Sequence, residues 1–457
     1  MKYLFLLIGL IIAQITFGQN QVQKIDSLLN PLFKNGQING NFLIAEKGKV
    51  IYKRSFGLAN EETKQPLNEK SIFEIASVTK QFTATAIMIL NEEDKLNLDD
   101  DISKFFPELI FYKGITIRHL LNHTSGLPDY MELLEKNFDK SKIETNNDII
   151  TFFAQKQPKV VFVPSSKYEY SNTGYIFLAS IIEKVSSETY DGFLQKNIFK
   201  PLKMNNTFVY KRRSEPKKID NYAYGYVYSD SLKQYILPDY LEETKFVNWL
   251  DGVVGDGGIN STINDLLKWD RALYTNKLLS KAAMIEMFSI TSLKDNTQIE
   301  YGYGWQIENH NEFGKIVYHG GGWPGYSTFF ARHLTDDKTI IILQNHDNIT
   351  LPVHSIRNIL YRKDEAMNII SSADQLQKFV GAYEIQPGFI IEVEKLNNQL
   401  YAKAAGQPTL ELIPQPENSF LLEEIEAKVI FNFNSEGTVK SLTFSQGGME
   451  IEGKKIK

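Results

Sequence analysis

Strand-like segments stand at both ends of a long, mostly helical region, and this order limits the folds that the chain can adopt. Residues 41–45 and 50–56 are rich in β-branched and aromatic residues and flank a short polar turn, which predicts a hairpin. Four more strand-like segments follow after residue 300, at residues 301–308, 315–319, 326–333 and 339–344. An α+β architecture fits this order: the first and last strands share one antiparallel sheet, covered by helices and by a separate helical lobe.

Helical periodicity indicates where the covering helices lie. From Gln19 to Gly36, and again from Ser77 onward, apolar residues recur at three- and four-residue steps, as on one face of a helix. We expect three further well-defined helices between the strands and one that closes the region, at residues 115–121, 147–155, 172–187 and 351–361.

The pattern changes after about Ala366. Short alternating segments, separated by Gly, Pro or Asn turns, then continue to the end of the sequence, at residues 389–394, 400–404, 410–413, 420–422, 428–433 and 439–444. Regular short strands of this kind predict a small all-β barrel or sandwich. We therefore expect a large domain over residues 19–367 and a small C-terminal β domain over residues 374–457.

Residues 1–18 have the pattern of a signal peptide. Lys2 supplies a positive charge, residues 4–12 are apolar, and residues 16–18 form a small-residue cleavage site. The apolar run is short for a bilayer span, and no other stretch reaches about 18 apolar residues. The sequence therefore predicts a secreted or periplasmic protein without a stable membrane span after cleavage. An uncleaved anchor is the alternative.

Composition excludes several classes of protein. Hydrophobic residues make up 42% and charged residues 23%, which is typical of a folded globular chain. The formal net charge is −5 and no Lys/Arg cluster is longer than residues 211–213, so no nucleic-acid partner is expected. The chain has no cysteine, which excludes disulfides, thiolate metal sites and a cysteine nucleophile. We expect no cofactor and no metal, and a small-molecule or peptide substrate; the sequence does not define an oligomeric state.

A serine and a lysine three residues apart begin the helical pattern at residue 77. On a helix such residues share a face, so the Ser77 hydroxyl and the Lys80 ammonium can meet in one pocket. The field of the helix N-terminus and burial both oppose a proton on Lys80, and a desolvated lysine can act as the base for a serine nucleophile. An ordinary exposed helical turn is the alternative for so short a motif.

The segment Tyr170-Ser171-Asn172 supplies a second set of polar groups. A tyrosine near a protonated lysine can lose its proton more easily and can exchange protons with a serine or a leaving group. Asn172 offers both a donor and an acceptor to a substrate amide. The alternative is a helix start capped by Ser171 or Asn172, and both interpretations can hold together.

His319 follows a strand-like segment and precedes three glycines. Glycine lets a bound chain approach the backbone closely, so Gly321 is expected to contact the substrate. The backbone N–H groups of Ser77 and Gly322 are expected to form an oxyanion hole. A glycine-rich turn beside a structural histidine is the alternative. A dinucleotide-binding motif is rejected, because Pro324 interrupts the glycines and a strand rather than a helix follows.

The three motifs, in the order Ser77, Tyr170 and His319, resemble those of the penicillin-recognising serine hydrolases, most closely the class C β-lactamase-like or CubicO-type group. Further segments within residues 20–365 are similar to that group, at residues 73–82, 115–128 and 257–262. The resemblance implies a β-lactamase/transpeptidase-like fold. The C-terminal module is similar to small β-barrel domains appended to some members of the group.

The resemblance also implies a role for each motif. Ser77 would become acylated, with Lys80 as its general-base partner. Tyr170 would share proton transfer and deprotonate the hydrolytic water, and Asn172 would hold the acyl amide of the substrate. His319, also a substrate-binding position, stands where many β-lactamases have a lysine that binds a carboxylate, and a histidine binds it less firmly.

The implied activity is therefore hydrolysis of amide or ester bonds through an acyl-enzyme. A D-amino-acid peptidase, carboxypeptidase-like or esterase activity is expected rather than an efficient β-lactamase. A penicillin-binding sensor or scaffold with little turnover is the alternative.

The remaining candidates have simpler interpretations. His119 and His123 are four apart, as in a metal pair, but no third ligand accompanies them, and the resembling segment is structural. Asp256 is interpreted as a turn residue. Alternating tyrosines over residues 222–228 are expected to pack, with the lining of a cleft as the alternative. No Gly-x-Ser-x-Gly elbow occurs, which argues against an α/β-hydrolase.

Overall fold

The computed structural model describes residues 21–137, 140–347, 349–361, 376–396, 399–405, 407–415, 418–422, 425, 427–434, 436–446 and 449–457. The chain divides into two compact units, one formed by Gly40–Asn345 and the other by Met1–Asn39 with His346–Lys457. The expected signal peptide, residues 1–18, and the expected domain boundary between residues 367 and 374 lie outside the described residues.

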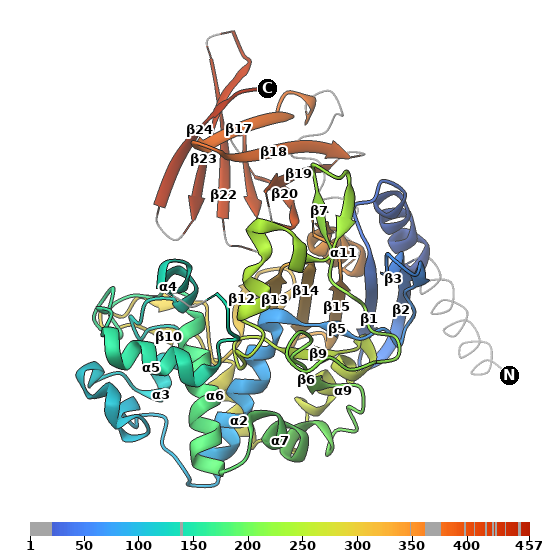
Figure 1. Cartoon of the computed structure of the whole chain (residues 1–457). Helices are drawn as coiled ribbons and strands as arrows, with labels where there is room; N and C mark the ends of the chain where they lie inside the picture. Colours follow the sequence, from blue (N-terminus) through green and yellow to red (C-terminus); the bar gives the residue numbers. More distant parts are fainter. Residues whose placement is uncertain are drawn as a thin grey trace, which may run out of the picture. The chain divides into compact units, whose positions relative to one another are not determined.

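A six-stranded antiparallel sheet organises the unit Gly40–Asn345 (Figure 1). Its order is β12-β13-β14-β15-β1-β2, and the strands are β1 (Gly40–Glu46), β2 (Lys49–Phe56), β12 (Gln306–His310), β13 (Gly314–Trp323), β14 (Tyr326–His333) and β15 (Lys338–Gln344). Strand β1 lies between β2 and β15, with Phe42 opposite Arg54 on one side and Ile342 on the other. The predicted union of the first and last strands in one sheet is confirmed.

The central strands are apolar because both of their faces are buried. Every residue of β14 and β15 is buried, as expected for the dense aliphatic run 340–343. Strand β12 begins at Gln306, later than the predicted residue 301. The backbone turns before this strand, where Gly304 has a φ of +77°.

Two long helices form the centre of the helical part. Helix α2 (Lys80–Glu92) packs against α6 (Asn172–Ser186), and both contribute to a core that includes Leu43 and Phe330 of the sheet. Helix α9 (Ile263–Ala272) packs on β1 and β15. The other α-helices of this unit are α3 (Ile117–Leu121), α4 (Tyr130–Asn137), α5 (Asn146–Lys156), α7 (Tyr190–Leu194), α8 (Phe246–Trp249) and α10 (Lys281–Met287). The predicted helices at 115–121, 147–155 and 172–187 correspond to α3, α5 and α6.

A small three-stranded sheet leads into the first turn of α2. It consists of β5 (Phe73–Glu74), β9 (Ile259–Ser261) and β6 (Phe208–Val209), in the order β5-β9-β6. A single 3-10 turn, η1 (Ala76–Thr79), follows β5 and lies against β13 and β14. The segments around residues 77, 260 and 320 therefore meet, although they are far apart in the sequence.

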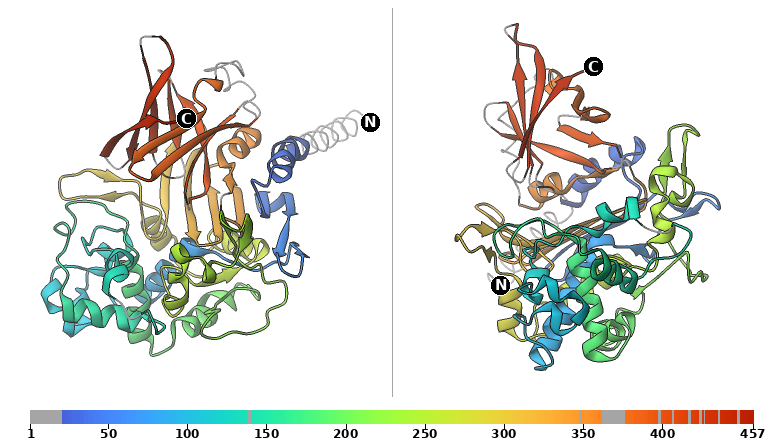
Figure 2. Two further views of the ribbon diagram at one scale, coloured as in Figure 1. Left: turned by 45° about the horizontal axis from the view of Figure 1, so that its top comes forward. Right: turned by 60° about the vertical axis from the view of Figure 1, so that its left-hand side comes forward.

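The C-terminal β domain is a closed eight-stranded barrel rather than a sandwich (Figure 2). Its strands are β17 (Gly381–Gln386), β18 (Phe389–Leu396), β19 (Gln399–Ala404), β20 (Thr409–Gln415), β21 (Ser419–Leu422), β22 (Ala427–Phe433), β23 (Val439–Gln446) and β24 (Met449–Lys455). Pairing of β20 with β21 closes the barrel. The sequence predicted six of these strands and missed β17 and β24, which pair with each other.

Three further elements belong to the same unit as the barrel. Strand β16 (Thr350–Leu351) pairs in parallel with β20, and helix α11 (Val353–Leu360) follows it. Residues 21–34 are helical, as their periodicity predicted. In the described part of the chain, none of the helices combines the length and the apolar character of a bilayer span.

Candidate active site

The Ser77 hydroxyl and the Lys80 ammonium lie together at the start of α2. Ser77 is on the 3-10 turn η1 and Lys80 is the first residue of α2, so the nucleophile candidate precedes the α-helix by one turn. The distance from Lys80 Nζ to Ser77 Oγ is 3.2 Å. Ala76 has a φ of +47°, a left-handed conformation that costs a non-glycine residue roughly 1–2 kcal/mol. Backbone strain of this kind is typical of functional sites.

Three acceptors surround the buried ammonium of Lys80. Besides Ser77, it donates to Asn172 Oδ1 at 2.9 Å and to the main-chain oxygen of Asp256 at 3.0 Å. Lys80 is fully buried, and this burial lowers its pKa to about 8, although the negative charges of Asp256 and Asp129 oppose the shift. A neutral amine beside Ser77 is therefore accessible near neutral pH.

Tyr170 completes the surroundings of Ser77 and Lys80. Its ring centroid lies 4.9 Å from Lys80 Nζ. Burial raises the pKa of the phenol well above its ordinary value of 10, against the opposing effect of a hydrogen bond with Ser77. The expectation that a nearby lysine eases loss of this proton is therefore wrong for the free protein, because the cost of burying a phenolate is larger. Tyr170 brings a neutral hydroxyl to the site.

The start of α6 places Asn172 in the site. Ser171 is at the N-cap position, as the alternative interpretation expected, but its side chain makes no capping hydrogen bond. The cap comes from Asp129, whose Oδ2 accepts the Asn172 N–H at 2.6 Å. The Asn172 side chain is thus left to accept from Lys80. Asp129 follows the recognisable segment 115–128 directly, and this adjacency is the one signal that could have identified it.

Asp256 does more than form a turn. It lies in a turn, as predicted, and its main-chain oxygen accepts from Lys80. Its carboxylate accepts from the Tyr130 hydroxyl at 3.0 Å. Burial raises the pKa of this carboxyl, and the charge of Lys80 opposes the shift. Sequence reasoning missed this contribution, because nothing local marks the two segments as neighbours.

His319 is buried and uncharged. Burial, with a contribution from the charge of Lys80, lowers its pKa to about 3. Its Nδ1 lies 2.5 Å from the Gly320 oxygen and its Nε2 lies 3.0 Å from the Tyr301 hydroxyl. A neutral imidazole has one donor and one acceptor, so Nδ1–H donates to Gly320 and Nε2 accepts from Tyr301. Both nitrogens are thus engaged within the protein.

The glycines of β13 differ in their surroundings. A Cβ at Gly321 would lie 2.6 Å from the Ile75 oxygen and 3.1 Å from Ser77 N, so only glycine allows β13 to approach η1 this closely. Thr328 Oγ1 donates to the same Ile75 oxygen at 2.9 Å. A Cβ at Gly322 would meet no atom within 4 Å. The oxyanion hole formed by the N–H groups of Ser77 and Gly322 stays a prediction.

The two histidines of the segment 115–128 have separate contacts. The His123 ring lies 4.3 Å from the Tyr170 ring, and its Nδ1 accepts the Ser171 N–H at 3.2 Å. His119 accepts the Thr116 N–H at 3.1 Å. His123 therefore supports the Tyr170 segment, which sequence reasoning missed. Within the described ranges, no group of three or more His, Asp or Glu side chains could hold a metal ion.

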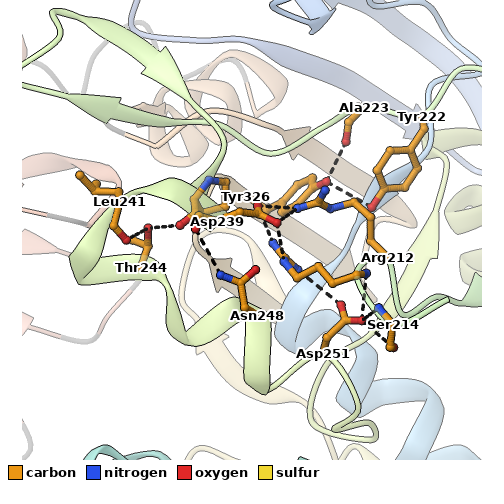
Figure 3. Close-up of polar contacts among 12 residues, drawn as sticks. Arg212, Ser214, Tyr222, Ala223, Asp239, Leu241, Thr244, Asn248, Asp251 and Tyr326 are labelled. Carbon is orange, nitrogen blue, oxygen red and sulfur yellow. Dashed lines mark hydrogen bonds and ion pairs between the residues drawn. The ribbon is translucent and has the colours of Figure 1, made fainter. Parts of the chain in front are cut away.

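The basic cluster at residues 211–213 forms a polar network with carboxylates, and the start of the tyrosine run lies beside it (Figure 3). Arg212 Nη2 donates to Asp239 at 2.6 Å, and Arg213 donates to the same carboxylate at 2.9 Å. Arg213 also pairs with Asp251. Tyr222 is buried beside these groups, as expected for packing. Tyr226 and Tyr228 line a cavity of about 470 Å³, as the alternative expected. The arginines are thus neutralised by carboxylates within the protein.

The antiparallel sheet, its helical lobe and the Ser-Lys pair at the start of α2 define a hydrolase of the β-lactamase/transpeptidase-like fold. The family model described as Beta-lactamase matches residues 25–357. A second model, described as a domain of unknown function (DUF3471), matches residues 365–456. The chain belongs to the beta-lactamase family, which confirms the resemblance found in the sequence.

Individual relatives agree with this assignment. Penicillin-binding protein 4* of Bacillus subtilis (strain 168) is 41% identical over 452 residues, which cover 96% of this chain and all of that protein. The octameric penicillin-binding protein homologue from Pyrococcus abyssi is 25% identical with a TM-score of 0.66, covering 94% of this chain and 99% of that one. A D-amino acid amidase from Ochrobactrum anthropi SV3, complexed with L-phenylalanine amide, is 25% identical with a TM-score of 0.60, covering 75% and 97%.

Proposed function

We propose that this hydrolase cleaves amide or ester bonds through an acyl-enzyme on Ser77. The observation that carries the proposal is the buried Lys80 amine, 3.2 Å from Ser77 Oγ and with a pKa lowered to about 8. Neutral Lys80 takes the proton of Ser77 as Oγ attacks the carbonyl carbon. The N–H groups of Ser77 and Gly322 stabilise the resulting oxyanion.

The later steps use the same groups. The neutral Tyr170 hydroxyl donates a proton to the leaving amine or alcohol and regains one from Lys80, so the Ser77 proton leaves with the departing group. Water then attacks the acyl-enzyme and passes one proton through Tyr170 to neutral Lys80. That proton returns to Ser77 Oγ as the bond between Oγ and the acyl carbon breaks, which releases the acid and restores Ser77. Asn172 Oδ1 accepts from Lys80, which leaves its amide nitrogen as a donor to the acyl part of the substrate.

The state of His319 favours substrates without a free carboxylate beside the scissile bond. Its imidazole is neutral and both nitrogens are engaged, so position 319 supplies neither a charge nor a spare donor to a carboxylate. D-Aminoacyl amides and esters fit this site better than peptides that end at the residue after the scissile bond. The structural similarity to a D-amino acid amidase supports this choice, and the penicillin-binding relative supports an origin in cell-wall peptides.

A matched pair of substrates tests the proposal. We expect D-alanyl-p-nitroanilide to be hydrolysed by the wild-type chain and not by Ser77→Ala. D-Alanyl-D-alanine, with a carboxylate next to the scissile amide, should react at least tenfold more slowly than D-alanyl-D-alaninamide, which has the same scissile amide and an uncharged amide in place of the carboxylate. Equal rates on the two substrates would contradict the role of His319, and turnover by Ser77→Ala at the wild-type rate would contradict the nucleophile. A single acylation without turnover would instead favour a penicillin-binding sensor.

We also propose that the protein acts outside the cytoplasm after removal of residues 1–18, and that its domains are residues 19–367 and 374–457. The signal-peptide pattern and the change in strand pattern after residue 366 support these proposals. N-terminal sequencing of protein exported by the native cell tests the first, with residue 19 as the expected first residue. Limited proteolysis tests the second, and the expected cleavage lies between residues 367 and 374.

A further inference from the structure

A cavity lies at the other end of β13 from the glycines at 321 and 322. It occupies about 240 Å³ between the end of α9, helix α10 and the strands β13 and β14. Its apolar wall comes from Leu273, Met284 and Phe288. Its positive charge comes from Lys281, Lys315 and Arg332. Within the ranges that the structure describes, no Asp or Glu side chain lines the cavity.

Arg332 is a buried cation with an unused donor. Its Nε donates to Asp270 Oδ1 at 2.7 Å and its Nη2 to the Asp270 main-chain oxygen at 3.3 Å. In the described part of the chain, Nη1 has no hydrogen-bond partner although it is buried. The guanidinium carbon lies 4.4 Å from the centre of the Tyr274 ring, which also lines the cavity. A buried unpaired donor is costly, and because Arg332 lines the cavity, an acceptor bound there that reaches Nη1 would relieve that cost.

Among the described residues, Lys315 is a second cation of this lining and forms no ion pair. Partial burial lowers the pKa of its ammonium. Lys281 stands on α10 at the exposed side of the cavity. A negative group between these two lysines would raise the pKa of Lys315 again, because it favours the charged ammonium. The charge and the apolar wall together select a ligand with one anionic end and one aliphatic end.

We propose that this cavity binds a small aliphatic carboxylate. The carboxylate lies between Lys315 and Lys281 within reach of Arg332 Nη1, and the alkyl chain lies along the wall formed by Met284 and Phe288. The volume suits a medium-length chain and is too small for a drug-sized ligand.

Octanoate is the probe for this site, measured by isothermal titration calorimetry on the full mature chain. We expect one saturable site with the same affinity in the wild type and in Ser77→Ala. Each buried methylene contributes about fourfold in affinity, so hexanoate should bind roughly fifteenfold more weakly. Lys315→Gln should weaken octanoate binding at least tenfold. Lys95→Gln, which changes an exposed lysine paired with Glu93, is the matched control and should leave binding unchanged.

Several outcomes would overturn the proposal. They are the absence of saturable octanoate binding, equal affinity of Lys315→Gln and the wild type, or octanol binding as tightly as octanoate. Phosphate binding as tightly as octanoate would show an inorganic-anion site instead. If Lys315→Gln does not fold, as judged by thermal unfolding, Lys281→Gln takes its place, because Lys281 is exposed and its side chain is not needed for packing.

Discussion

The hydroxyl of Tyr301 lies 3.0 Å from Nε2 of His319, and this contact determines what the histidine can offer to a substrate. Tyr301 is almost completely buried. Its ring also lies 4.7 Å from the His123 ring and 6.4 Å from the Tyr170 ring. One phenol therefore holds the imidazole and packs behind the proposed proton donor.

Removal of this hydroxyl tests whether the contact matters. In Tyr301→Phe, the buried Nε2 of His319 loses its partner, which should lower the free energy of unfolding by about 1–3 kcal/mol. The His319 ring, 6.0 Å from the Tyr170 ring, would no longer be fixed, and the resulting displacement of Tyr170 should also reduce kcat on the order of tenfold. Urea unfolding and steady-state kinetics measure the two effects. Tyr303→Phe is the matched control, because the Tyr303 hydroxyl contacts Arg118 and Glu286 instead. In Tyr303→Phe we expect a loss of stability without a loss of kcat. The same result in Tyr301→Phe would contradict a role of Tyr301 in the active site.

The pKa of Lys80 predicts the pH dependence of acylation. The base must be neutral, and the fraction of neutral lysine rises with pH up to its pKa of about 8. The value of kcat/KM should therefore increase about tenfold per pH unit below pH 8 and level off above it. A rate profile from pH 5 to 10 measures this limb. A flat profile across this range would show that Lys80 is not the base.

Asp256 should influence the pH at which kcat/KM stops rising. Its negative charge raises the pKa of Lys80, so Asp256→Asn should move the acidic limb of kcat/KM to lower pH. Asp99→Asn changes a carboxylate that pairs with Arg118, and it should leave the limb where it is. A limb that does not move in Asp256→Asn, or that moves to higher pH, would refute the electrostatic role of Asp256.

Two adjacent glycines provide a steric test. In Gly321→Ala, the new Cβ would press on the Ile75 oxygen and displace the Ser77 backbone, and a shift of about 1 Å at a nucleophile costs on the order of 100-fold in rate. Gly322→Ala adds its Cβ to open space and should stay within a few-fold of the wild type. Comparison of kcat/KM in the two variants measures the difference. Similar rates would show that β13 does not constrain Ser77.

Loss of the buried Asp270 carboxylate near β14 should lower the free energy of unfolding more than loss of a partly exposed carboxylate. Asp270 is fully buried and pairs with both Arg332 and Arg271, so Asp270→Asn leaves buried charge uncompensated. The expected loss is about 3–5 kcal/mol in the free energy of unfolding. Asp337 pairs with Arg271 at a more exposed position, and Asp337→Asn should cost at most about 1 kcal/mol. Equal losses in urea unfolding would contradict this ranking.

Local sequence patterns predicted much of the secondary structure. Strand β14 has the predicted bounds, residues 326–333, because aromatic and apolar residues buried on both faces mark a central strand. The three-residue spacing of Ser77 and Lys80 predicted their contact, although the first turn is 3-10 rather than α. Strand β24 was missed because Gly453 and consecutive lysines weaken its pattern, and its pairing partner β17 is far away in the sequence.

Long-range contacts determined the rest of the site. Asp129, Asp256 and Tyr301 reach Asn172, Lys80 and His319 from segments that local pattern does not connect. Burial, which no short motif encodes, reversed the expected tendency of Tyr170 to lose its proton. The motifs thus predicted which residues meet, and tertiary packing decided their protonation.

The most direct test of the central proposal is the mass of the intact chain after brief incubation with a penicillin, with Ser77→Ala as the control. A penicillin also has a carboxylate beside its scissile bond, but its strained β-lactam amide is reactive enough to acylate a serine although position 319 does not hold that carboxylate. We expect an adduct of one penicillin on the wild-type chain, located on Ser77 by peptide mapping and absent from the control. An adduct on another residue, or an equal adduct on Ser77→Ala, would contradict the assignment of Ser77 as the nucleophile.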